Sequence, residues 1–243
     1  MFRAILKGVR VVAACAVMSV GIGGIANAAT IFFGENSNPT PDGTVSGDPV
    51  TARNDFLSNL VDVGTENFES LADGPLPVNL TFPGSAGGIT ATLKGENMFI
   101  TDNPTGERFA TSGAKLVQGA GDFEITFSQE IAAFGFFATD VGDTGGSLSL
   151  ETSNGSVHSF LVPHSLLSPT GSLLFWGIID TANTFTKVKF SNSSPFTDVF
   201  GFDDFTIGNV AQSAVPLPPG IALFASGLGL MGLLGWRRRK QAA

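Results

Sequence analysis

The chain has 243 residues, 43% of them hydrophobic and 14% charged, and a formal net charge of −8. Three of its 13 Lys and Arg residues lie in the first 28 positions and four in the last seven, so the body between sets six cations against all 21 acids. That body, with a net charge of −15, excludes nucleic acid as a partner, because phosphate binding needs a positive field. The single cysteine, Cys15, lies outside the body, which therefore forms no disulfide.

Residues 1–28 have the pattern of a secretion signal. Three cations begin it: Arg3, Lys7 and Arg10. An apolar stretch follows at 11–25, and Ala-Asn-Ala at 26–28 matches the small-x-small pattern before a cleavage site. We expect cleavage between Ala28 and Ala29. The alternative is lipidation at Cys15, since the residues before it loosely resemble a lipoprotein cleavage box.

Residues 29–64 are expected to form an N-terminal arm and one short helix. The segment 34–50 is rich in Gly, Asn, Pro, Thr and Asp, which is typical of a loop. Between 51 and 60 the apolar residues recur at helical spacing, which predicts the helix.

Residues 65–210 read as short strands separated by clusters of turn residues. This pattern predicts an all-β domain, an antiparallel β-sandwich of the jelly-roll-like kind. The expected strands are 67–69, 78–82, 89–93, 98–100, 115–117, 123–127, 131–139, 147–151, 157–162, 173–179, 185–190 and 202–207.

Four local patterns sharpen that expectation. Residues 123–127 alternate apolar and polar side chains, as a half-buried strand does. Residues 131–139 are apolar on both faces, which predicts a central strand covered twice. Phe185 is out of phase with the rest of its strand, which indicates a bulge or a late start. Asn154-Gly155 predicts a hairpin.

Two adjacent carboxylates, Asp203 and Asp204, interrupt an apolar strand. Successive side chains on a strand point to opposite faces, so one of them must face inward or lie at a sheet edge, where it needs a partner. Calcium is one such partner, because it takes six to eight oxygen ligands. Glu69 and Asp140 could join the site as further ligands. The alternative is that these acids cap turns or accept backbone hydrogen bonds.

Catalytic motifs are missing from the body of the sequence. It contains no Gly-x-Ser-x-Gly and no His-Glu-x-x-His, and its two histidines, His158 and His164, have no companion motif. We therefore expect a protein that is not an enzyme, although spaced carboxylates of a glycan-active enzyme would leave no sequence signature. Trp176, the single Trp of the body, is the candidate ligand-binding residue of a sugar site.

The segment 211–243 carries three features in order. A proline-rich motif comes first: Val215, Pro216, Leu217, Pro218 and Pro219. Residues 220–236 are uncharged and would give about 25 Å of helix, the short end of what spans a bilayer. The basic tail 237–240 includes Arg237, Arg238 and Arg239, so the tail should be cytoplasmic and the body outside.

Together with the N-terminal signal, these features resemble the PEP-CTERM sorting signal of Gram-negative bacteria, in a variant that has Leu217 where the namesake motif has Glu. The resemblance implies export through the inner membrane, a C-terminal helix in the membrane, processing by an exosortase-type peptidase, and a place at the cell surface or outside the cell. The short segments around Glu69, residues 134–140 and Asp203 resemble the jelly-roll domains of such proteins. Those domains are similar to carbohydrate-binding modules, which often hold a structural calcium.

We therefore expect a non-enzymatic surface or matrix protein that associates with extracellular polysaccharide. The alternatives are a calcium-stabilised carbohydrate-binding module and a glycan-active enzyme.

Overall fold

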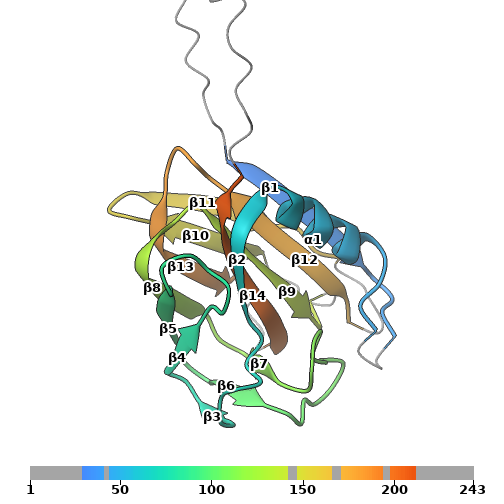
Figure 1. The fold of residues 1–243 in the computed structure, drawn as a ribbon. Coiled ribbons are helices and arrows are strands. Elements are labelled where there is room, and N and C mark those ends of the chain that lie inside the picture. Colours follow the sequence, from blue (N-terminus) through green and yellow to red (C-terminus); the bar gives the residue numbers. More distant parts are fainter. Residues whose placement is uncertain (1–28, 41–43, 142–146, 166–170, 194–197, 212–243) are drawn as a thin grey trace, which may run out of the picture.

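Apolar residues alternate with polar ones along many of the strands, and two antiparallel sheets bury these apolar sides against each other (Figure 1). The structure is a computed structural model, and it describes residues 29–40, 44–141, 147–165, 171–193 and 198–211. The expected all-β sandwich with one short helix is confirmed.

Sheet A has the strand order β1-β12-β9-β14-β7-β6-β3, and β2 also pairs with β14. Its strands are β1 (Thr30–Asn36), β2 (Leu60–Glu66), β3 (Gly74–Pro75), β6 (Met98–Thr101), β7 (Leu116–Gly119), β9 (Ala133–Thr139), β12 (Leu173–Ile179) and β14 (Phe200–Val210). The long strand β14 is central: β9 pairs along one edge, while β7 and then β2 pair along the other.

Sheet B has the strand order β11-β10-β13-β8-β5-β4. Its strands are β4 (Val78–Thr81), β5 (Thr90–Gly95), β8 (Phe123–Ile131), β10 (Leu148–Ser153), β11 (Val157–Val162) and β13 (Phe185–Asn192). The register of β13 against β8 shifts between Phe185 and Lys187, so the predicted irregularity is confirmed. Asn154-Gly155 lies in the connection between β10 and β11, which confirms the predicted hairpin.

The main core lies between the sheets and consists mostly of Phe rings. Phe123 of sheet B stacks on Phe190 at 5.3 Å between ring centroids and meets the edge of Phe202 of sheet A at 4.9 Å. Phe supplies this area without a hydroxyl that would need a partner, which suits a chain with 22 Phe and no Tyr.

A second apolar cluster lies on the outer side of sheet A, beneath the helix α1 (Asp48–Ser58) (Figure 1). Phe56 of α1 is fully buried there. It packs over Gly135 of β9 and Gly177 of β12, where an added Cβ would lie 3.1 and 3.0 Å from ring atoms of Phe56. Strand β9 is therefore buried on both faces, as predicted for 131–139, although it begins at Ala133 because Ile131 is the last residue of β8.

The boundaries at the N-terminal end differ from those predicted. Residues 29–64 are not an arm outside the sandwich, because β1 forms an edge of sheet A and β2 pairs with β14. The helix begins at Asp48 rather than Thr51, with a proline in its first turn, and ends before Leu60 because β2 begins there.

The segment 67–69, predicted as a strand, is a turn. Phe68 has φ +63°, and the Leu71 N–H donates to the Phe68 carbonyl at 3.0 Å. The strand next to this segment is β2, which ends at Glu66, just before the turn.

Both ends of the described chain lie at the same end of the sandwich. Figure 1 shows the start of β1 and the end of β14 there, drawn in blue and orange-red. The first strand residue, Thr30, pairs with Ile179, which in turn pairs with Ala133 at the start of β9. At the other end of the described chain, the Ala211 N–H donates to the carbonyl of Asn59, just before β2, at 2.8 Å.

Candidate functional site

Asp203 and Asp204 lie at an irregularity in the middle of β14. The register of β14 against β9 shifts between Asp203 and Thr206, and Asp204 has φ +50°. Such a bulge re-aims side chains that would otherwise follow the regular alternation. Here it turns both carboxylates toward the loop before β7, on the outer side of sheet A.

The two carboxylates hold that loop through several hydrogen bonds. Asp203 Oδ2 accepts from the N–H groups of Thr111, at 2.7 Å, and Ser112, at 3.0 Å. Asp203 Oδ1 accepts from the Asp204 N–H at 2.7 Å, and the Ser112 hydroxyl donates to Asp204 Oδ1 at 2.6 Å. The Thr111 hydroxyl lies 3.1 Å from an oxygen of each carboxylate. Asp203, which is 1% exposed, therefore has the partner that its burial requires.

Burial is the main cause of an unusual charge state at this site. Desolvation, together with the neighbouring Asp204 carboxylate, raises the pKa of Asp203 from 3.8 to about 8. The backbone N–H groups of Ser112, Asp204 and Thr111 act in the opposite direction and lower that pKa, but they only partly offset the rise.

The other two candidate calcium ligands have other partners. Glu69 Oε1 accepts from the N–H groups of Ala114, at 2.8 Å, and Lys115, at 2.6 Å. Asp140 forms an ion pair with Arg108, whose guanidinium also donates to the Val199 carbonyl at 3.1 Å. In the described ranges no group of three or more His, Cys, Asp or Glu side chains is placed to hold a metal ion. The four acids do not converge in this structure, and calcium at the Asp203–Asp204 pair stays a prediction.

Trp176 is not a surface platform for a sugar, and that expectation was wrong. The side chain is 0% exposed and packs in the main core between Phe136 and Phe160, with ring centroids 6.0 and 6.3 Å away. Its Nε1 is buried and has no hydrogen-bond partner among the described residues. The sequence misled because a lone Trp on a fully buried strand looks the same, residue by residue, as one on an exposed strand.

The predicted signal and sorting residues fall outside the described ranges, with one exception. That exception is Ala29, the expected mature N-terminus, which is partly buried and packs against the main core. Ala28, the motif 215–219, the apolar run 220–236 and Arg237 to Arg239 are not among the described residues. No helix within the described ranges is long and apolar enough to cross a membrane.

The outer face of sheet B is the open face of the sandwich. The outer side of sheet A is covered by α1 and by Phe109 of the loop before β7, whereas the outward side chains of sheet B are exposed or half-buried. A groove of about 480 Å³ lies on this face across β4, β5 and β8. We call it the sheet B groove; its outward polar residues are Asn79, Thr81, Thr90, Thr92, Thr126 and Ser128.

The groove lining offers hydroxyl and amide groups without charge. Asn79, Thr92 and Thr126 are successive cross-strand neighbours, and the Thr92 hydroxyl donates to Asn79 Oδ1 at 3.3 Å. The sequence analysis did not predict that these residues form a groove. The sequence places Thr, Ser or Asn at every second residue of three strands, which is a pattern that could have indicated the groove. The pattern is not sufficient, because only the strand register shows that these residues are neighbours.

Comparison with known proteins finds solved structures of similar fold but no family to which the chain can be assigned. No family model matches the chain, and no curated protein matches it. Similar solved structures include TmCBM61 in complex with β-1,4-galactotriose, at 18% identity and a TM-score of 0.33, covering 49% of this chain and 88% of that one.

Two further similar structures are a cleaved adhesin domain and a carbohydrate binding module. The K2 cleaved adhesin domain of Lys-gingipain has 16% identity and a TM-score of 0.38, over 60% of this chain and 97% of that one. The C-terminal family 22 carbohydrate binding module of Clostridium thermocellum Xyn10B has 12% identity and a TM-score of 0.33, over 62% and 95%. Similarity at this level does not decide what this chain binds.

Proposed function

We propose that this protein is an exported, non-catalytic binding protein of the cell surface or extracellular matrix, and that it binds a neutral polysaccharide in the sheet B groove. We propose further that its C-terminal segment is sorted and processed by an exosortase-type peptidase. The observation that carries the binding proposal is the groove itself, an open and uncharged row of hydroxyl and amide groups across three strands.

The chemistry of the groove favours a carbohydrate. Sugar hydroxyls both donate and accept hydrogen bonds, as do the hydroxyl and amide side chains that line the groove. An extended polymer can lie across neighbouring strands, because the groove is open along the sheet face. The net charge of −15 on the body repels acidic polymers, which favours a neutral chain.

Affinity electrophoresis in gels that contain xylan, galactan or laminarin tests the binding proposal. At least one polymer should retard the wild-type protein. The triple variant Asn79→Ala, Thr92→Ala, Thr126→Ala should bind it at least about tenfold more weakly, since each lost hydrogen bond is worth about 0.5–1.5 kcal/mol.

A matched control lies on the same sheet face, outside the groove. Ser149 of β10 and Ser191 of β13 are cross-strand neighbours, so the double variant Ser149→Ala, Ser191→Ala removes hydroxyls from the same sheet. It should bind like the wild type. Equal weakening by both sets of variants, or no retardation of the wild type by any neutral polymer, would overturn the proposal.

A further inference from the structure

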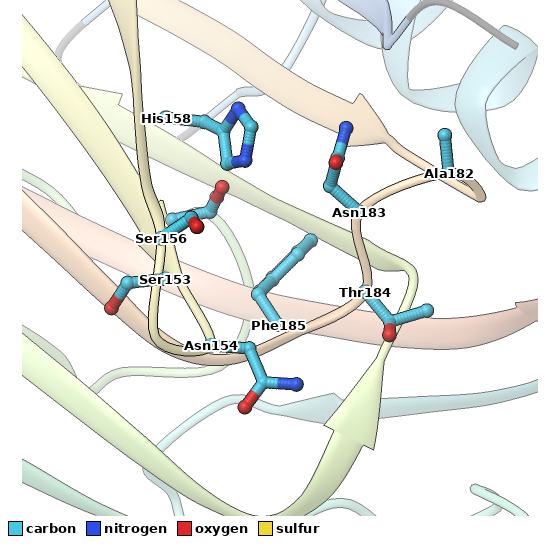
Figure 2. A pocket seen from close by; sticks show the side chains of 9 residues that line it. Ser153, Asn154, Ser156, His158, Ala182, Asn183, Thr184 and Phe185 are labelled. Atoms are coloured by element: carbon cyan, nitrogen blue, oxygen red, sulfur yellow. The ribbon is translucent and has the colours of Figure 1, made fainter.

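A separate pocket of about 240 Å³ opens at one end of the sandwich, away from the sheet B groove. It lies between the β10–β11 hairpin and the loop that joins β12 to β13 (Figure 2). We call it the end pocket; it is lined by Thr152, Ser153, Asn154, Ser156, His158, Ala182, Asn183, Thr184 and Phe185.

The end pocket contains a polar group that lacks a partner. Thr152 is 0% exposed, and its hydroxyl has no hydrogen-bond partner within the described part of the chain. A buried hydroxyl without a partner lowers the stability of the fold, because it has given up its hydrogen bonds to water. Since Thr152 lines the end pocket, a ligand with hydroxyl groups could supply the missing partner.

Two amides at the rim are held by carboxylates behind them. Asn183 Nδ2 donates to Asp180 Oδ2 at 3.1 Å, and Asn154 Nδ2 donates to Glu130 Oε1 at 2.8 Å. Each amide oxygen is thereby left to accept a hydrogen bond from a ligand. Figure 2 shows the side chains of His158 and Asn183 on opposite sides of the opening, with Phe185 between them.

Hydrogen bonds within the protein hold the rim of the end pocket in place. Asp180 is 1% exposed, and its Oδ1 accepts from the N–H groups of Ala182, at 3.1 Å, and Asn183, at 2.8 Å, which fixes the loop after β12. The Thr184 hydroxyl donates to Glu130 Oε2 at 2.6 Å, which ties the same loop to the end of β8. A preorganised rim lowers the entropic cost of binding.

We infer that the end pocket binds one neutral sugar unit, either a free monosaccharide or the terminal unit of a glycan. No Lys, Arg, Asp or Glu is among the described residues that line it, and the Asp180 and Glu130 carboxylates behind the rim already accept hydrogen bonds from the protein, which favours an uncharged ligand. Its volume lies below the range of about 300–1,000 Å³ of pockets for drug-sized ligands, which suits a single ring. The exposed Ala182 supplies apolar contact for the C–H face of a sugar, whereas Phe185 is buried in the main core.

The inference extends the proposed function without depending on the same residues. The sheet B groove spans β4, β5 and β8, whereas the end pocket lies beside β10 and β11, on the other half of sheet B. The groove would bind the interior of a polymer, and the end pocket a single unit or chain end.

Nuclear magnetic resonance of the histidine side chains provides the test, because the chain has only two histidines. D-glucose, D-galactose and D-mannose are titrated separately into the full chain, with D-glucuronate as the charged comparison. At least one neutral sugar should shift the imidazole signals of His158, saturably, and glucuronate should not. The signals of His164, whose Nδ1 lies 2.8 Å from the Ser165 carbonyl oxygen and which is not among the pocket residues, should stay in place.

The variant Thr152→Val separates a binding role from a structural one. It removes the hydroxyl and keeps the shape, so the melting temperature should not fall, while the dissociation constant for the sugar should rise at least tenfold. The matched control is Thr139→Val, because Thr139 is 1% exposed and its hydroxyl is likewise buried without a partner in the described structure, but it does not line the end pocket. That control should keep wild-type affinity.

Each outcome bears on one inference at a time. The end pocket assignment is overturned if no neutral sugar shifts His158, or if Thr152→Val binds the sugar as tightly as the wild type does. The polymer proposal fails separately, when neutral polymers do not retard the protein. A sugar that binds at His158 without polymer retardation would leave the end pocket standing alone.

Discussion

Asp203 connects the loop before β7 to the central strand of sheet A, and its burial there raises its pKa. Its carboxyl group accepts hydrogen bonds from Thr111 and Ser112, yet desolvation and Asp204 raise its pKa to about 8. In the unfolded chain its pKa is near the ordinary value of 3.8. Between these two values the folded state holds a proton that the unfolded state has lost, so stability falls as pH rises across this window.

The variant Asp203→Asn should therefore flatten the pH dependence of folding. In the wild type this residue lowers the free energy of unfolding by up to about 1.4 kcal/mol per pH unit between about pH 4 and 8. The variant lacks the titrating group and should lose that slope in urea unfolding measured across the window. Asp102→Asn, on the exposed start of the same loop, is the control and should keep the wild-type slope. Parallel slopes for wild type and Asp203→Asn would contradict the assignment.

The same variant bears on the calcium prediction. An ion at the Asp203–Asp204 pair would replace the proton that desolvation favours, and binding only the folded state stabilises it by mass action. Millimolar calcium should then raise the melting temperature of the wild type at pH 7 and leave that of Asp203→Asn unchanged. An equal shift in both proteins would place any calcium elsewhere.

Two strands whose own residues are mostly apolar were predicted with the right bounds. Strands that are recognisable only from their pairing with other strands were not predicted. The bounds of β11 and β12 match the predicted ranges 157–162 and 173–179. Strands β1 and β2 were missed because Gly and polar residues interrupt them, so that only pairing with β12 and β14 defines them as strands. Local sequence carries the first kind of information and lacks the second.

The helix α1 makes a quantitative prediction at the scale of the element. Its hold on sheet A depends on Phe56, whose ring packs over Gly135 and Gly177. Phe56→Ala should lower the free energy of unfolding in urea by about 3–5 kcal/mol, from lost burial plus the cavity left behind. Asn54→Ala, on the exposed side of α1, should change it by less than about 0.5 kcal/mol. A loss below about 1 kcal/mol for Phe56→Ala would mean that α1 is not part of the cooperative fold.

At the scale of the whole molecule, the sandwich could be predicted but its binding surfaces could not. The carboxylate pair of β14 was visible in the sequence, together with its need for partners. The residues that meet it, Thr111 and Ser112, lie about ninety positions earlier in an unremarkable loop. The sheet B groove and the end pocket likewise combine residues from separate strands, which only register brings together.

The predicted sorting signal makes a prediction about the whole chain. In a host that carries an exosortase, the wild-type protein should lose the residues that follow the motif 215–219, and in the same host without the peptidase it should keep them. The triple variant Arg237→Ala, Arg238→Ala, Arg239→Ala removes most of the cytoplasmic stop and should not be processed. Intact-mass measurement of the exported protein reads out each case. A chain that ends at Ala211 is the control and should have one mass in both hosts, whereas a complete tail on the wild type in both would refute the sorting proposal.

The position of β14 determines how the sandwich would respond to a mechanical load. Its last residue, Val210, lies next to the end of the described chain, and a C-terminal attachment would pull on β14 through the residues that follow. The ladders of β14 to β9, β7 and β2 run along both of its edges. A force on that end acts along the central strand and shears these ladders together, rather than opening them one bond after another. A sandwich held through this end would therefore resist drag with many hydrogen bonds at once, whereas the same force applied across an edge strand would peel the sheet open.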